Sequence, residues 1–148
     1  IMAANAEDLA MVKLLTEKGA NINLRDKAGN SALFYAISMN NGQIADYLFQ
    51  KNAEIILEDL FQVVQLGSSR NVKKILKLKP DFVQKANKDG ETALFEAVRY
   101  SQSKIAEILI KAGADKSHKN KQGKLAVELI TTQTQNDLKM IKILSAEK

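Results

Sequence analysis

The chain has 148 residues, enough for one domain with a self-supporting hydrophobic core. Its 45% hydrophobic and 26% charged residues argue against a disordered segment, while 5% aromatic residues and a single proline argue against an all-β fold. The absence of cysteine excludes disulfides and thiolate metal sites. No apolar run approaches the ~18 residues of a membrane span, so we expect a soluble, cytoplasmic protein without membrane insertion.

An apolar triplet with helical spacing recurs along the whole chain. Each copy places apolar side chains at positions i, i+3 and i+4, which form one face of an α-helix. The first members lie 33, 28, 33 and 35 residues apart, so the period is near 33 residues, with one shortened and one lengthened repeat. The copies are Met11/Leu14/Leu15, Ile44/Tyr47/Leu48, Val72/Ile75/Leu76, Ile105/Ile108/Leu109 and Met140/Ile143/Leu144.

A second apolar set precedes two of these triplets and predicts another short helix in each repeat. The turn between the two helices contains Asn40 in one repeat and Ser101 in another, residue types that tolerate tight or left-handed backbone geometry. Each repeat is therefore predicted to be a helical hairpin. The preceding sets, in which the small alanines favour close helix packing, are Leu33/Ala36/Ile37 and Leu94/Ala97/Val98.

Glycines punctuate the polar stretches between the hairpins. Gly19 and Gly113 follow an apolar triplet, where a helix end favours a positive φ. The next glycines in the pattern, Gly29, Gly90 and Gly123, are predicted to close a tight turn just before the following helix. Two of these helices begin at good N-cap residues, Ser31 and Thr92.

These stretches resemble the motifs of the ankyrin-repeat family. Residues 26–34 and 87–95 are similar to the family's Asp-x-x-Gly-x-Thr-Pro-Leu-His, and residues 19–23 and 113–115 resemble its Gly-Ala-Asp-Val-Asn turn. The family's unit is about 33 residues of β-turn plus two helices. The resemblance implies an all-α fold, an ankyrin-repeat solenoid of antiparallel helix pairs joined by β-turn or hairpin fingers.

The resemblance divides one domain, residues 1–148, into repeats of about 1–25, 26–58, 59–86, 87–119 and 120–148. The third repeat lacks the Asp-x-x-Gly turn, so we expect its finger to be missing. The last repeat has Leu125 in place of Thr and a two-residue insertion around 131–136, as in a drifting or capping repeat. Because Ile1 already lies inside the repeat pattern, we expect the chain to be a fragment of a longer protein.

The sequence offers no pattern for catalysis or cofactor binding. His118 is the only histidine, and it lies in a polar connection with no nucleophile turn nearby. The acidic pairs Glu7/Asp8 and Glu58/Asp59 fall at predicted helix starts, where the helix dipole favours negative charge. We therefore expect no catalytic residue, no metal site, no cofactor and no enzymatic activity.

The resemblance also implies where a partner would bind, on a concave face made of finger tips and the ends of the first helices. Met39 and Tyr100 are the expected anchors, because large adaptable or aromatic side chains in a groove commonly dominate binding energy. The last finger is basic. The candidate partner-binding residues are Arg25, Lys27, Asn30, Ser38, Met39, Lys88, Asp89, Glu91, Arg99, Tyr100, Lys119, Lys121, Gln122 and Lys124.

Three functions are compatible with such a surface. The first is a monomeric, non-enzymatic protein–protein interaction module, a scaffold or adaptor that binds a partner protein with an acidic or phosphorylated segment. The second is the recognition arm of a multidomain enzyme, such as a secreted bacterial effector delivered into a host cell. The third, nucleic-acid binding, is disfavoured because the net charge of +5 is modest and acidic Asp89 and Glu91 interrupt the groove. Alternatively, the lysines of the last finger are a solvated turn that keeps the protein soluble.

Overall fold

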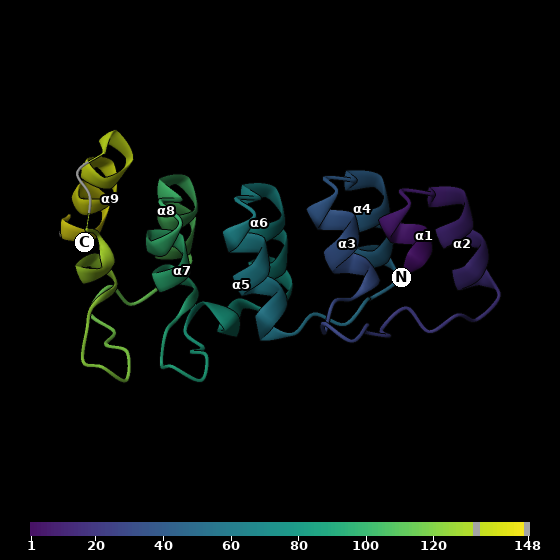
Figure 1. Ribbon diagram of the computed structural model, residues 1–148, viewed down its shortest axis with the longest axis horizontal. Helices are drawn as coiled ribbons and strands as arrows, with labels where there is room; N and C mark the ends of the chain where they lie inside the picture. The colour runs from purple at the N-terminus through teal and green to yellow at the C-terminus, as the bar shows by residue number, and fades with distance from the viewer. Residues whose placement is uncertain (132–133, 147–148) are drawn as a thin grey trace. The chain divides into compact units, whose positions relative to one another are not determined.

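The computed structural model describes residues 1–131 and 134–146, and within these residues it contains helices and turns but no extended strand (Figure 1). The chain forms two compact units, residues 1–55 and 56–148, which we call the N-terminal unit and the C-terminal unit. Both are built from short helices joined by tight turns. The all-α fold predicted from the apolar spacing is confirmed.

The N-terminal unit contains two helical hairpins. The helices are α1 (Met2–Asn5), α2 (Leu9–Glu17), α3 (Ala32–Ser38) and α4 (Gly42–Gln50). Helix α1 packs against α3 and α2 against α4, so one hairpin stacks on the other. Asp8 is the N-cap of α2 and accepts a hydrogen bond from the Met11 backbone N–H at 2.8 Å, as its position at a predicted helix start implied.

The apolar triplets of α2 and α4 differ in what covers them. Ile44 and Leu48 of α4 are fully buried, whereas Met11 and Leu15, which occupy the same places in α2, are 42% and 43% exposed. The prediction of a helix is correct in both cases. Helix α2 packs against α1 and α4 within its unit, and its outer apolar face is left in solvent.

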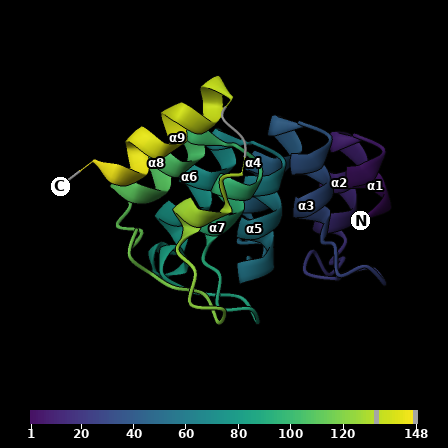
Figure 2. The same cartoon turned by 60° about the vertical axis from the view of Figure 1, so that its left-hand side comes forward.

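The C-terminal unit arranges its helices in two rows. The first row contains α5 (Leu57–Gln65), α7 (Ala93–Arg99) and the 3-10 helix η2 (Ala126–Leu129), and each packs against the next. The second row contains α6 (Ser69–Leu78), α8 (Ser103–Lys111) and α9 (Gln135–Ser145), and the 3-10 helix η1 (Pro80–Val83) packs against α6. We call α5, α7 and η2 the inner row and the others the outer row (Figure 2).

The third repeat lacks a finger, as predicted. Extended chain leads directly into α5, where the backbone N–H of Ile56 donates to Asp59 Oδ2 at 2.8 Å. Fingers with an antiparallel bridge precede α3, α7 and η2. The two fingers of the C-terminal unit project from the same end of its helices (Figure 1).

The last repeat departs most from the others. Its first helix is the four-residue η2, and α9 follows with Thr134 as an N-cap whose hydroxyl accepts from the Asp137 backbone N–H at 3.2 Å. The insertion expected around residues 131–136 includes residues 132–133, which lie outside the described residues. Helix α9 packs against α8 and η2, and it buries Met140 and Leu144 of the last apolar triplet.

Candidate functional site

Three fingers are built by the same hydrogen bonds. In the first, Asp26 Oδ1 accepts from the backbone N–H groups of Ala28 and Asn30, both at 2.9 Å, and the Asp26 N–H donates to the Asn30 carbonyl at 3.0 Å. Asn87 and Asn120 make the same three bonds in the other two fingers. A side-chain oxygen that binds the backbone two residues on fixes a turn without help from neighbours. The predicted tight turns are confirmed.

A glycine closes each finger in the left-handed region of φ. Gly29, Gly90 and Gly123 have φ values of 83°, 77° and 76°. The backbone N–H of each glycine donates to the carbonyl of the first finger residue, at 2.9 to 3.0 Å. Left-handed backbone strains any residue that carries a Cβ, so the turn favours glycine.

The finger of the N-terminal unit is tied to the helix that follows it. The Tyr35 hydroxyl donates to Asp26 Oδ2 at 2.6 Å. This bond, with the backbone N–H of Asn30, lowers the pKa of Asp26 below its ordinary value. The charged carboxylate is therefore part of the folded finger.

The two fingers of the C-terminal unit are joined to each other. The Lys121 N–H donates to the Asp89 carbonyl at 3.0 Å, and Asn120 Nδ2 donates to Glu91 Oε1 at 3.2 Å. The imidazole of His118 joins the same fingers, since its Nε2 lies 2.8 Å from the Gly90 carbonyl oxygen. Within the residues that the structure describes, the hydrogen-bond partner of the His118 imidazole is this backbone carbonyl.

Arg99 lies at the centre of a charged network on the inner row. Its Nη2 is 2.6 Å from Glu91 Oε2, and its Nη1 donates to Glu96 Oε1. Burial acts to lower the pKa of Arg99, but the hydrogen bond to Glu91 and the two carboxylate charges outweigh burial and raise it. Glu91 and Glu96 are 8% and 6% exposed, so the network commits the Glu91 carboxylate and most of the charge of Arg99 to the protein itself, and it fixes the position of the Glu96 carboxylate.

The other sequence-predicted residues divide by exposure. Arg25, Asn30 and Ser38 are half-buried, and Arg25 Nη1 donates to the Gly29 carbonyl at 3.0 Å. Asp89 and Gln122 are exposed. The tip lysines are exposed and make no ion pair within the part of the chain that the structure describes; they are Lys27, Lys88, Lys119, Lys121 and Lys124.

The first helices of three hairpins end in large apolar side chains. Met39 and Tyr100, the expected anchors, are 44% and 48% exposed at the C-caps of α3 and α7. Leu66 occupies the same position at the end of α5 and is 47% exposed. Sequence reasoning missed Leu66, although the left-handed residue Gly67 that follows it marks the same hairpin turn.

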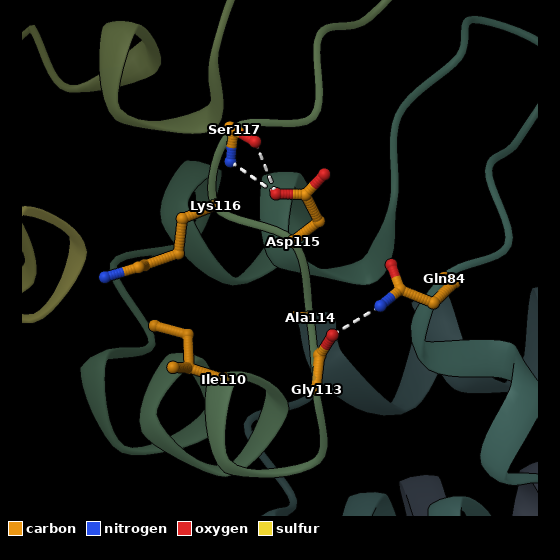
Figure 3. A pocket seen from close by; sticks show the side chains of 7 residues that line it. All are labelled: Gln84, Ile110, Gly113, Ala114, Asp115, Lys116 and Ser117. Atoms are coloured by element: carbon orange, nitrogen blue, oxygen red, sulfur yellow. Dashed lines mark hydrogen bonds between the residues drawn. The ribbon is translucent and has the colours of Figure 1, made fainter. Parts of the chain in front are cut away.

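A hollow of about 470 Å³ lies at the base of the last two fingers (Figure 3). Its lining already contains internal hydrogen bonds: Gln84 Nε2 donates to the Gly113 carbonyl, and Asp115 Oδ1 accepts from the Ser117 N–H and hydroxyl at 2.8 and 2.6 Å. Among the described residues, no group of three metal-ligating side chains could hold a metal ion. Nor does any helix described in the structure have the length and apolar character to cross a membrane.

Comparison with protein families assigns the fold to a known class. The family model described as ankyrin repeats (many copies) matches residues 1–49, and the ankyrin repeat model matches residues 89–121, together more than half of the chain. The chain belongs to the ankyrin-repeat family. The resemblance inferred from the sequence motifs is thereby confirmed. Ankyrin repeats generally mediate protein–protein interaction and are typically non-catalytic.

Curated relatives of this ankyrin-repeat chain are much longer than it is. It is 35% identical over 69 residues to the putative ankyrin repeat protein FPV034 of Fowlpox virus (strain NVSL), a match that covers 47% of this chain and 17% of that protein. It is 33% identical over 96 residues to the ankyrin repeat-containing protein F37A4.4 of Caenorhabditis elegans, covering 65% of this chain and 7% of the relative. The chain thus spans a small part of the relatives that it matches.

A solved structure resembles the ankyrin-repeat chain along almost its full length. It is one chain of the complex of the Bd0816 predatory endopeptidase from Bdellovibrio bacteriovorus with the immunity protein Bd3460. The TM-score is 0.79 at 28% sequence identity, and the match covers 99% of this chain and 78% of that chain. The structural neighbour is therefore a protein seen bound to another protein.

Proposed function

We propose that this ankyrin-repeat chain is a non-enzymatic protein–protein interaction module, a scaffold or adaptor that acts in the cytoplasm as a monomer. One observation carries the proposal. The fingers satisfy their turn groups internally, through Asp26, Asn87, Asn120 and the backbone, whereas their tip lysines are exposed and form no ion pair within the described residues. Charge that is not used to hold the fold is available to a partner.

The partner surface that fits these tips is acidic. Two fingers that hydrogen bonds hold together carry Lys88, Lys119, Lys121 and Lys124, and these four lysines outnumber the one exposed carboxylate of the same fingers, that of Asp89. Clustered charges of one sign steer an oppositely charged partner during encounter. We therefore propose an acidic or phosphorylated segment as the ligand of the fingers, with phosphate the stronger acceptor.

The inner row adds exposed apolar side chains to the proposed partner surface. Tyr100 and Leu66 end neighbouring inner helices, α7 and α5, and each is about half exposed. Exposed aromatic and large aliphatic side chains that become buried in a complex contribute most of the binding energy in many interfaces. We propose that Tyr100 and Leu66 anchor the partner, and that Met39 has the same role in the N-terminal unit.

A peptide-array experiment tests this function. Arrays of acidic and phosphorylated peptides are probed with the wild-type chain and with the double variant Lys121→Glu/Lys124→Glu. The control, Lys73→Glu/Lys77→Glu, makes the same charge change at two exposed positions of α6 in the outer row. The proposal predicts that some peptides bind the wild type and the control variant but no longer bind Lys121→Glu/Lys124→Glu. Equal binding by all three proteins, or no binding at all, contradicts it.

A further inference from the structure

A hollow in the C-terminal unit lies beside α5, the first helix of the repeat that lacks a finger. Its volume is about 250 Å³, and it is lined on one side by α5 and on the other by Asn87 and Glu96. Phe61, which is buried, and Leu57, which is half-buried, contribute apolar surface, while Glu58 and Glu96 contribute carboxylates. The lining contains no lysine or arginine. Glu96 is already paired with Arg99, which lies outside the lining, so the hollow contains one carboxylate without a cation, that of Glu58.

Comparison of α5 with α7 explains the unbalanced charge. Counted back from the left-handed turn residue of each hairpin, Gly67 or Ser101, Gln65 takes the place of Arg99. The arginine pairs with Glu91 and Glu96 in the fourth repeat, but Gln65 brings no charge and only donates its Nε2–H to Glu96 Oε2 at 3.2 Å.

The two carboxylates of the hollow differ in how they are held. Glu58 is exposed and has no ion pair within the described part of the chain. Glu96 is buried, and its position is fixed by donors from Gln65 and Arg99. Since an ionised carboxylate has about four acceptor sites, Glu96 keeps capacity for one more donor. The hollow therefore offers one fixed and one exposed carboxylate, and the ring of Phe61 is part of its lining.

We propose that this hollow seats one basic side chain of the partner protein, and that arginine fits it better than lysine. The aliphatic stem of the arginine packs on Leu57 and Phe61, and its guanidinium, a planar group with five N–H donors, reaches Glu58 and Glu96 together. A lysine offers one compact ammonium and fits a pair of separated carboxylates less well. This inference rests on the proposed protein-binding function and adds a basic residue to the acidic segment proposed for the fingers.

An NMR titration of the whole chain tests the seat without knowledge of the partner. The probe is N-acetyl-arginine amide, and its matched control is N-acetyl-citrulline amide, which has nearly the same shape and no charge. We expect saturable chemical-shift changes in the backbone amides of residues 57–65 and 96 with the arginine compound only. No saturable shifts there with the arginine compound, or equal shifts with both compounds, would overturn the proposal.

Two variants, each with a matched control, test whether the arginine compound binds in the hollow. Glu58→Gln should weaken arginine binding by about two- to fivefold, the range of an exposed ion pair. Glu54→Gln, an exposed glutamate of the N-terminal unit, should leave binding unchanged. Gln65→Lys should abolish binding, because the new ammonium occupies the hollow from within, whereas Gln50→Lys adds the same charge at the end of α4 without effect. Unchanged binding in both Glu58→Gln and Gln65→Lys overturns the seat.

The finger variant separates this inference from the proposed function. Lys121→Glu/Lys124→Glu should bind the arginine compound as the wild type does or slightly better, because the changed residues do not line the hollow. If acidic peptides bind the fingers and arginine does not bind the hollow, the seat is wrong and the proposed function holds. If arginine binds and no acidic peptide does, the finger proposal is wrong.

Discussion

A substitution at Gly90 tests the contact between the two fingers of the C-terminal unit. A Cβ built on Gly90 would lie 2.9 Å from the backbone nitrogen of Lys121, whereas a Cβ on Gly123 would have no atom within 4 Å. The two glycines have nearly the same φ, 77° and 76°. Gly90→Ala and Gly123→Ala therefore impose the same backbone strain, and only Gly90→Ala also pushes the fingers apart.

The two variants should differ in stability by a measurable amount. Left-handed backbone costs an alanine about 1–2 kcal/mol, and both variants carry this cost. In Gly90→Ala the Lys121 nitrogen must also move from 2.9 Å to an ordinary contact of at least 3.4 Å, and that movement breaks its 3.0 Å bond to the Asp89 carbonyl. A lost hydrogen bond adds about 0.5–1.5 kcal/mol. We expect Gly90→Ala to lower the free energy of unfolding by about 1 kcal/mol more than Gly123→Ala.

Urea unfolding followed by circular dichroism gives the two free energies, and amide hydrogen exchange shows where the difference arises. In Gly90→Ala the Lys121 amide should lose its protection, while the Asn120 amide, which bonds to Lys124 within its own finger, should keep it. In Gly123→Ala, the Lys121 amide should stay protected. Equal free energies for the two variants, or an unchanged Lys121 exchange rate in Gly90→Ala, would refute the contact between the fingers.

Other consequences of the structure can be measured in the same way. The pKa of Asp26 is lowered in the folded chain, so its charge stabilises the N-terminal unit fully at pH values above 3.8, the ordinary pKa, and this stabilisation is lost as the pH falls through the folded pKa. Tyr35→Phe should raise the pKa of Asp26 in an NMR titration. Asp26→Asn should remove this pH dependence of stability while keeping the finger. Arg99→Ala should lower the free energy of unfolding by about 1–3 kcal/mol, because the buried carboxylates of Glu91 and Glu96 lose their cation. Arg99→Lys should recover only part of this loss. An unchanged urea midpoint in Arg99→Ala would contradict the network. Tyr100→Ala should leave the urea midpoint within about 0.5 kcal/mol of wild type but reduce peptide binding, and a stability loss larger than this would show that Tyr100 is part of the core.

The repeat architecture was accessible from the sequence because its determinants are local. The spacing of apolar residues predicts the helices. The turn chemistry of Gly90 and its equivalents predicts where helices begin, and that of Asn40 and its equivalents predicts where they end. The absence of an Asp-x-x-Gly turn before Leu57 predicts the missing finger for the same reason. Each of these features depends only on residues that are close together in the chain, so a single sequence is enough to predict it.

The surroundings of individual side chains were less accessible, because they depend on what another segment brings nearby. Arg99 was expected to face a partner, and the structure places it between Glu91 and Glu96, a pairing of which only the i, i+3 half is visible in the sequence. Likewise, an apolar stripe shows that α2 has one apolar face but does not say what covers it, and Met11 is exposed where Ile44 is buried. The spacing of apolar residues therefore predicts which face of a helix is apolar, whereas the burial of that face depends on the segment that packs against it.

The C-terminal unit exposes charges of both signs, and its third and fourth repeats differ in how these charges are paired. In the fourth repeat, the last residues of the finger before α7 include Glu91, and Arg99 neutralises that charge. Where the finger is absent, as before α5, the helix starts earlier, Glu58 enters its first turn, and a glutamine stands in place of the arginine. The third repeat thus has an anion without a paired cation, in the same unit as two fingers whose exposed charges are four lysines and Asp89. A partner that fits both features must carry acidic residues for the fingers and a separate basic side chain for the hollow, which a uniformly acidic polymer such as nucleic acid does not offer.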